Sequence, residues 1–234
     1  MVVNLLQKRK QEIKGFKGEQ EMKKVLLIGD SIRQGYDKYV KKALADSCEV
    51  YYPNENCRFA QYVLRHLSDW KRDLELGDDV DAVHWNTGLW DTLVQYGDGC
   101  LTPPEVYEAF IDRICRRIRV LFPNAKVIFA TSTPVVESRF PNPAVSHRKN
   151  SDIEKYNEIA VNVAKKYGFF VNDLYAAVKD LPEDCYSDMT HLYTPEGTSI
   201  LTSAVLRSLC SALELDPVEF TISDYQAAKG VLGH

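Results

Sequence analysis

The sequence has 234 residues, enough for one domain that buries its core without disulfides or metals. Its hydrophobic fraction of 45% and charged fraction of 26% are ordinary for a globular protein and exclude a disordered or fibrous chain. Because 33 acidic residues outnumber 29 basic ones, for a net charge of −4, no nucleic acid and no anionic membrane surface is expected as a partner.

Residues 1–23 form an N-terminal extension, read either as a short amphipathic helix or as a loose segment. The extension lacks the apolar core of about 7 to 15 residues that a secretory signal needs, so a cytoplasmic location is expected. No apolar run approaches the length of a membrane span. The six cysteines show neither C-x-x-C pairs nor histidine spacing typical of zinc sites, and we expect no metal and no cofactor.

Five short apolar runs predict β-strands, and segments with helical spacing lie between them. This alternation indicates βαβ units, and hence an α/β fold with a five-stranded parallel sheet. The first run, KVLLI, is continuously apolar, as in a strand buried on both faces. The predicted strands are residues 24–28, 49–52, 82–86, 126–131 and 169–172.

Three helices have recognisable starts. A capping hydroxyl at Thr102, followed by two prolines, predicts a helix to Phe122. Ser151 and Glu154 have the spacing of a capping box and predict a second helix to residue 166. Thr194 precedes Pro195 and Glu196 and opens a helix through residue 213. The main domain is residues 24–215, and residues 216–234 form a C-terminal tail.

Ligands of parallel α/β sheets bind at the carboxyl ends of the strands. Ser31 follows the first strand in Gly29-Asp30-Ser31, and Asp188-x-x-His191 lies in the loop before the Thr194 helix, which returns to the same edge. A serine nucleophile needs a base and a group that orients the base, and His191 and Asp188 are of the right kinds. Each residue taken alone has a simpler interpretation. Ser31 could cap a helix, Asp188 could be a turn residue, and His191 could be an ordinary loop histidine.

Together these motifs resemble the SGNH/GDSL hydrolase family over roughly residues 24–213. The resemblance implies a flavodoxin-like three-layer α/β/α sandwich and acyl transfer to water with Ser31 as nucleophile and Asp188 and His191 completing a triad. It also implies an oxyanion hole. Two of the family's blocks are altered, since Cys57 replaces a glycine and Trp90 replaces an asparagine in Gly88-Leu89-Trp90-Asp91. The expected oxyanion donors are the backbone amides of Ser31 and Cys57 and the side-chain amide of Asn86.

Four further residues near these motifs are candidate substrate-binding residues. Arg33 and Arg58 have the chemistry to recognise a carboxylate or phosphate, although arginines are commonplace on protein surfaces without such a role. Trp90 and Tyr193 offer rings that stack on a sugar or line an acyl pocket. Asp30 is expected to shape the turn around Ser31 by accepting backbone N–H groups.

The leading hypothesis is a hydrolase of small acyl esters, above all O-acetyl groups on carbohydrates, whose partner is a small acyl ester or an acylated sugar. One alternative is a binding protein that kept the fold without turnover. A second is metal-dependent phosphoester hydrolysis, whose five candidate ligands are Asp30, His84, Asp91, Asp188 and His191. The sequence leaves the oligomeric state open.

Overall fold

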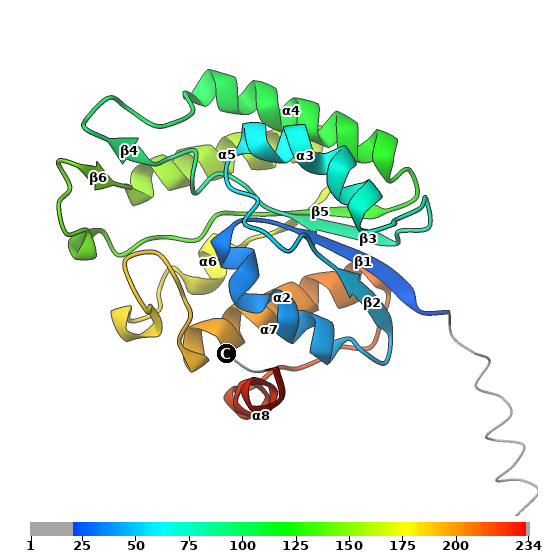
Figure 1. Cartoon of the computed structure of the whole chain (residues 1–234). Helices are drawn as coiled ribbons and strands as arrows, with labels where there is room; N and C mark the ends of the chain where they lie inside the picture. The colour runs from blue at the N-terminus through cyan, green and yellow to red at the C-terminus, as the bar shows by residue number, and fades with distance from the viewer. Residues whose placement is uncertain (1–20, 233–234) are drawn as a thin grey trace, which may run out of the picture.

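The computed structural model describes residues 21–232, and its centre is a five-stranded parallel sheet (Figure 1). The strands are β1 (Lys23–Ile28), β2 (Cys48–Tyr51), β3 (Ala82–Trp85), β5 (Lys126–Ala130) and β7 (Phe170–Asn172). They lie in the order β2-β1-β3-β5-β7, the flavodoxin-like order, with register pairs such as Leu26 with Val83. All five predicted strands and the three-layer α/β/α fold are confirmed.

Helices cover both faces of the sheet because alternate strand residues point to opposite sides. Val25 and Leu27 belong to the core beneath α2 (Ser31–Ala43), α6 (Leu174–Val178) and α7 (Pro195–Leu213). Leu26 and Ile28 belong to the core beneath α3 (Ala60–Asp73), α4 (Pro104–Leu121) and α5 (Asn150–Lys166). Figure 1 shows these two helical layers on either side of the strands.

One of the three predicted N-caps is confirmed and two are not. Thr194 caps α7, since its Oγ1 accepts a hydrogen bond of 3.1 Å from the Gly197 N–H. The caps predicted at Thr102 and Ser151 are wrong. The N-cap of α4 is Pro103, without a side-chain bond, and α5 begins one residue before Ser151, at Asn150. The Asn150 side chain instead bonds the backbone of Val135 in both directions, at 2.9 Å each, and so ties the start of α5 to the segment after β5.

Two loops at the carboxyl edge of the sheet are joined by a small antiparallel pair. Strand β4 (Val94–Gln95) follows β3, and β6 (Ser146–His147) follows β5 and the short 3-10 helix Glu137–Arg139. Val94 pairs with His147. A second 3-10 helix, Glu183–Cys185, precedes the Asp188 loop. Segments far apart in the sequence therefore meet above the strand ends.

The C-terminal segment carries a helix, α8 (Ile222–Leu232), which packs on α2 and α7. The Tyr225 ring lies 5.1 Å from that of Tyr39, and the Phe220 ring 5.7 Å from it. Residues 1–20 of the expected N-terminal extension lie outside the described residues. Within residues 21–232, no helix combines the length and apolar character needed to span a bilayer.

Candidate active site

The turn after β1 presents Ser31 at the first residue of α2. Asp30, fully buried, is the N-cap of this helix, and its Oδ1 accepts hydrogen bonds from the Ile32 N–H at 3.0 Å and from Asn86 Nδ2 at 3.3 Å. Burial raises the pKa of Asp30. The structural role expected for Asp30 is confirmed. Because Asp30 supplies the cap, the Ser31 hydroxyl is not used as one.

Ser31, His191 and Asp188 form a continuous hydrogen-bonded chain. Ser31 Oγ lies 2.8 Å from His191 Nε2, and His191 Nδ1 lies 2.7 Å from Asp188 Oδ2. The other carboxylate oxygen of Asp188 accepts the backbone N–H groups of Thr190 and His191, at 2.6 and 2.8 Å. Burial raises the pKa of Asp188, but these hydrogen bonds outweigh it and hold the pKa below its ordinary value. An ionised Asp188 is thus in place to fix the His191 tautomer.

Tyr193 contacts both Ser31 and His191. Its hydroxyl donates to the Ser31 carbonyl oxygen at 2.5 Å, and its ring stacks on the His191 imidazole. Gly35 permits this approach, because a Cβ atom there would lie 2.6 Å from the Tyr193 ring. The side chain is still 39% exposed, so its outer edge also remains open to a ligand.

The N–H groups that are free to act as oxyanion donors differ from those expected. The Cys57 N–H donates to the Gly29 carbonyl oxygen at 3.1 Å, so it is not free to bind an oxyanion, and the expectation for Cys57 is wrong. The Ser31 N–H donates to no acceptor among residues 21–232. The Asn86 side-chain amide, 3% exposed, uses one N–H for Asp30. Its second N–H donates to no acceptor in the same range. Two donors therefore remain.

Of the two arginines singled out, only Arg58 is accessible. Arg33 is 1% exposed, and its guanidinium donates to Asp37 and to the carbonyl oxygens of Gly29 and Glu55. It braces the turns after β1 and β2, so the substrate-binding role expected for Arg33 is wrong. Arg58 is exposed, with its guanidinium 5.0 Å from the centre of the Tyr62 ring.

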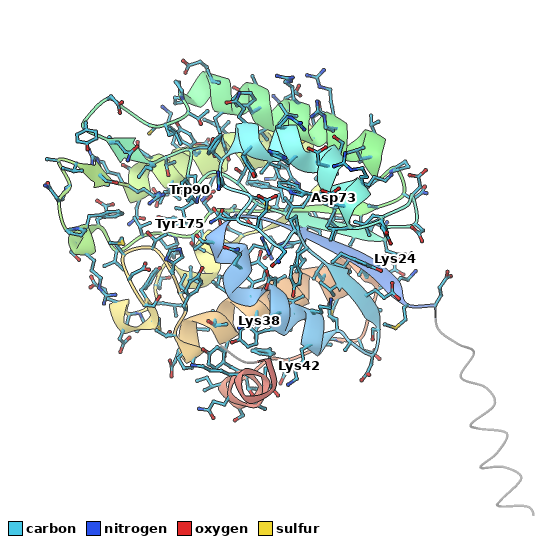
Figure 2. The ribbon with its side chains drawn as sticks, viewed as in Figure 1. Lys24, Lys38, Lys42, Asp73, Trp90 and Tyr175 are labelled. Atoms are coloured by element: carbon cyan, nitrogen blue, oxygen red, sulfur yellow. The ribbon has the colours of Figure 1, made fainter. Side chains whose placement is uncertain are left out.

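The turn after β3 needs the glycine that the family motif has. Gly88 has φ = +134°, and a Cβ atom there would lie 2.8 Å from the Tyr107 hydroxyl. The side chain of Trp90, two residues on and labelled in Figure 2, is partly exposed and makes no hydrogen bond that the structure records within residues 21–232. Asp91 is fully buried and accepts the Ala60 N–H at 3.1 Å with its Oδ2, and burial raises its pKa to about 6. Asp91 therefore anchors α3.

One arginine of the site was missed by the sequence reasoning. Arg148 lies in the loop after β5, and its Nε donates to the Leu89 carbonyl oxygen at 2.5 Å. Burial lowers its pKa, and the charge of Asp30 opposes that effect. An arginine in a long polar loop carries no local signal of where its guanidinium lies.

The candidate metal ligands do not gather. His84 is fully buried beside Asn172, with its Nε2 3.1 Å from Asn172 Nδ2, and burial lowers its pKa to about 4. Over residues 21–232, no three His, Cys, Asp or Glu side chains are placed to hold a common ion.

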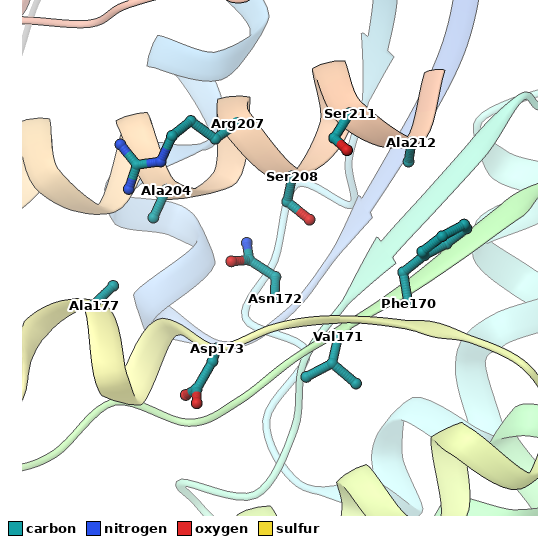
Figure 3. A pocket seen from close by; sticks show the side chains of 10 residues that line it. All are labelled: Phe170, Val171, Asn172, Asp173, Ala177, Ala204, Arg207, Ser208, Ser211 and Ala212. Carbon is teal, nitrogen blue, oxygen red and sulfur yellow. The ribbon is translucent and has the colours of Figure 1, made fainter. Parts of the chain in front are cut away.

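A hollow of about 360 Å³ lies along the edge strand β7, between it and helices α6 and α7 (Figure 3). Polar side chains from Asn172, Asp173, Arg207 and Ser208 line it. None of Ser31, Asp188 and His191 contributes to its walls. The hollow is separate from the hydrogen-bonded serine and carries no nucleophile with an adjacent base.

Comparisons with known proteins agree with this fold. Solved structures with the same fold include a lipase/acylhydrolase from Enterococcus faecalis, with 20% identity, a TM-score of 0.64 and coverage of 85% of this chain and 100% of that one. Also similar is an acetylxylan esterase from Geobacillus stearothermophilus, with 18% identity, a TM-score of 0.60 and coverage of 84% of this chain and 96% of that one. An alpha/beta hydrolase from the metagenome of Lake Arreo, Spain, has 16% identity, a TM-score of 0.60 and coverage of 84% of this chain and 99% of that one. No curated protein matches the sequence. Residues 27–195 match the GDSL-like lipase/acylhydrolase family, and since this match spans most of the chain, the protein belongs to that family.

Proposed function

We propose that the protein is a serine esterase that cleaves small acyl esters through an acyl-enzyme on Ser31, and that its substrates are O-acetyl groups on carbohydrates or similar short-chain esters. The observation that carries the proposal is the 2.8 Å contact between Ser31 Oγ and His191 Nε2, with Asp188 on the opposite ring nitrogen. The acetyl preference rests on likeness of fold to the acetylxylan esterase, and on analogy alone.

In the proposed mechanism, His191 Nε2 takes the Ser31 proton as Oγ bonds to the ester carbonyl carbon. The carbonyl oxygen becomes an oxyanion, which accepts from the Ser31 N–H and the unused N–H of Asn86. The bond between the acyl carbon and the alcohol oxygen then breaks, and this oxygen takes the proton from His191. A water molecule next gives its proton to His191 and its oxygen to the acyl carbon. Ser31 leaves with that proton, and the acid is released.

The test is hydrolysis of p-nitrophenyl acetate and a longer-chain homologue, with and without a chelator. Ser31→Ala is expected to lower kcat by about 10⁴-fold or more, because all steps pass through Oγ. Ser132→Ala is the matched control. This buried serine follows strand β5 of the same sheet, and its Oγ lies 3.5 Å from the Thr87 carbonyl oxygen, without an imidazole partner. Unchanged turnover in Ser31→Ala would overturn the mechanism.

The second candidate is a binding protein with the hydrolase fold. Two observations favour it, namely Trp90 at the family's asparagine position and the Cys57 N–H already used by Gly29. Wild-type protein without turnover on any ester, but with ligand binding at Ser31, is the result it predicts. A Ser31-dependent, chelator-insensitive reaction that favours the short ester supports the esterase instead.

A further inference from the structure

Arg148 is held beside the proposed site from two directions. Its Nε donates to the Leu89 carbonyl oxygen, in the turn that links Asn86 to Asp91. The preceding residue, His147, pairs with Val94 in the β4–β6 ladder. The base of the guanidinium is therefore fixed over the turn after β3, and this turn also carries the proposed oxyanion donor.

The charge of Arg148 has no matching acid within ion-pair distance in residues 21–232, and its two terminal nitrogens donate to nothing in that range. Arg33 shows how this fold satisfies a structural guanidinium, because its donors meet the Asp37 carboxylate and two backbone carbonyl oxygens. Partial burial without a partner is unfavourable for a charged group. An anion that fills the open side of Arg148 would compensate for it, since a guanidinium binds carboxylates and phosphates with paired hydrogen bonds.

A second unpaired arginine flanks the same turn. The Arg58 carbonyl oxygen accepts from the Thr87 hydroxyl at 3.5 Å, which links the turn after β2 to the turn after β3. The Arg58 side chain is exposed and, within the described range, forms no ion pair with an acid. Glu55, the acid nearest it in the chain, is instead engaged by the Tyr62 hydroxyl and Trp70 Nε1, at 2.7 and 2.8 Å.

No acid of this edge forms an ion pair with either arginine among residues 21–232. Asp30 and Asp91 are fully buried, and burial raises the pKa of both, to about 6 for Asp91. Asp188 is paired with His191. Arg148 and Arg58 are therefore left without an ion-pair partner beside the turn after β3 in the described part of the chain, although the full sequence has a net charge of −4.

We infer that Arg148, with Arg58 at the rim, forms an anion-binding subsite, and that the ester substrate carries a carboxylate or phosphate on its alcohol portion. This inference rests on the proposed function. If the acyl group is small, the larger alcohol portion of the ester is the part that lies beside Arg148 and Arg58. It names a specificity-determining residue that the family match leaves unassigned.

The experiment compares three acetyl esters that differ only in the group opposite the ester: 4-acetoxybenzamide, 4-acetoxybenzoate and 4-acetoxyphenyl phosphate. Wild type is expected to have a higher kcat/KM for an anionic ester than for the amide. The anionic ester with the higher kcat/KM shows whether the subsite is suited to a carboxylate or to a phosphate. Arg148→Gln is expected to lower the ratio of kcat/KM for that anionic ester to kcat/KM for the amide by about 10- to 100-fold, mostly through KM. Arg148→Lys should restore part of this ratio, and Arg58→Gln should lower it less, because Arg58 is exposed.

Arg117→Gln is the matched control, because that guanidinium also donates to one backbone carbonyl oxygen, at Leu64, but lies between α3 and α4. It should leave the ratio unchanged. A wild type that does not distinguish the esters, or an Arg148→Gln protein that loses activity equally on all three, overturns the inference.

A binding measurement separates this inference from the proposed function. Calorimetric titration of Ser31→Ala protein with 4-acetoxybenzoate and 4-acetoxyphenyl phosphate should show binding that Arg148→Gln weakens by about 10-fold or more in the same background. Equal binding with and without Arg148 also overturns the inference. If the Ser31→Ala protein still hydrolyses the ester, Ser31 is not the nucleophile and the proposed function fails. The effect of Arg148→Gln on binding still tests the anion-binding subsite in that case.

Discussion

The Tyr193 ring stacks on the imidazole of His191, with 4.6 Å between ring centres and 26° between their planes. The same tyrosine donates its hydroxyl to the Ser31 carbonyl oxygen at 2.5 Å. One side chain thus holds the proposed base and the residue that it acts on, although they are 160 positions apart in the chain. Positioning of this kind affects turnover more than substrate affinity.

Tyr193→Phe is therefore expected to lower kcat about 5-fold, since it removes one hydrogen bond of about 1 kcal/mol and keeps the stacked ring. Tyr193→Leu, which removes the stack as well, should have a larger effect. Steady-state kinetics on p-nitrophenyl acetate measures both. Circular dichroism checks that the proteins are folded. A Tyr193→Phe protein with unchanged kcat and a raised KM would assign the hydroxyl to substrate binding instead.

Asn86→Ala is expected to lower kcat by about 100- to 1000-fold, the usual effect of losing one oxyanion donor. Asn157→Ala is its control, because Asn157 is a second buried amide near the strand ends and bonds the Ser132 backbone at 2.8 and 2.9 Å. The control should lose stability without a matching loss of kcat. Similar kcat values for the two variants would show that Asn86 serves only to hold Asp30.

Asp91 predicts a pH dependence of stability. Burial raises its pKa from 3.8 to about 6, so the folded protein holds the proton more tightly than the unfolded chain. The resulting stabilisation is complete below about pH 3.8 and is lost as the pH rises through 6. Relative to Asp91→Asn, the wild-type free energy of unfolding should fall by up to about 3 kcal/mol between pH 4 and pH 7.

Urea denaturation of both proteins across this pH range measures that difference. The asparagine variant keeps an oxygen that can accept the Ala60 N–H, so the comparison isolates the charge. A difference that does not change with pH, or that grows in the opposite direction, would contradict the raised pKa of Asp91.

Helix α8 is expected to contribute to the stability of the whole domain. Tyr225 is 7% exposed and packs on Tyr39, so Tyr225→Ala should lower the free energy of unfolding by about 2 to 4 kcal/mol. Ile222→Ala, on the same helix at a side chain that is 40% exposed, should lower it by less than about 1 kcal/mol. Equal effects of the two changes would mean that α8 is not packed as described.

Within this structure, the sequence alone determined the sheet and the edge where chemistry is expected. Continuous apolar runs such as Val25 to Ile28 can only be buried on both faces, so the five strands follow from local patterning. Parallel strands bring their carboxyl ends to one edge, and Ser31 and the loop that carries Asp188 and His191 were expected there for that reason. His191 lies within hydrogen-bond distance of both Ser31 and Asp188.

Only the tertiary structure decided which polar groups are free. Nothing in the sequence distinguishes the hydrogen bonding of Arg33 from that of Arg148. The guanidinium of Arg33 donates to Asp37 and two carbonyl oxygens, whereas Arg148 donates only to the Leu89 carbonyl oxygen among the described residues and keeps N–H groups without an acceptor there. The Cys57 amide is likewise consumed by Gly29. Strand patterning depends on the burial of neighbouring residues, and a single sequence shows it. Hydrogen-bond satisfaction at this edge depends on how turns from three different strands meet, and no single segment contains that information.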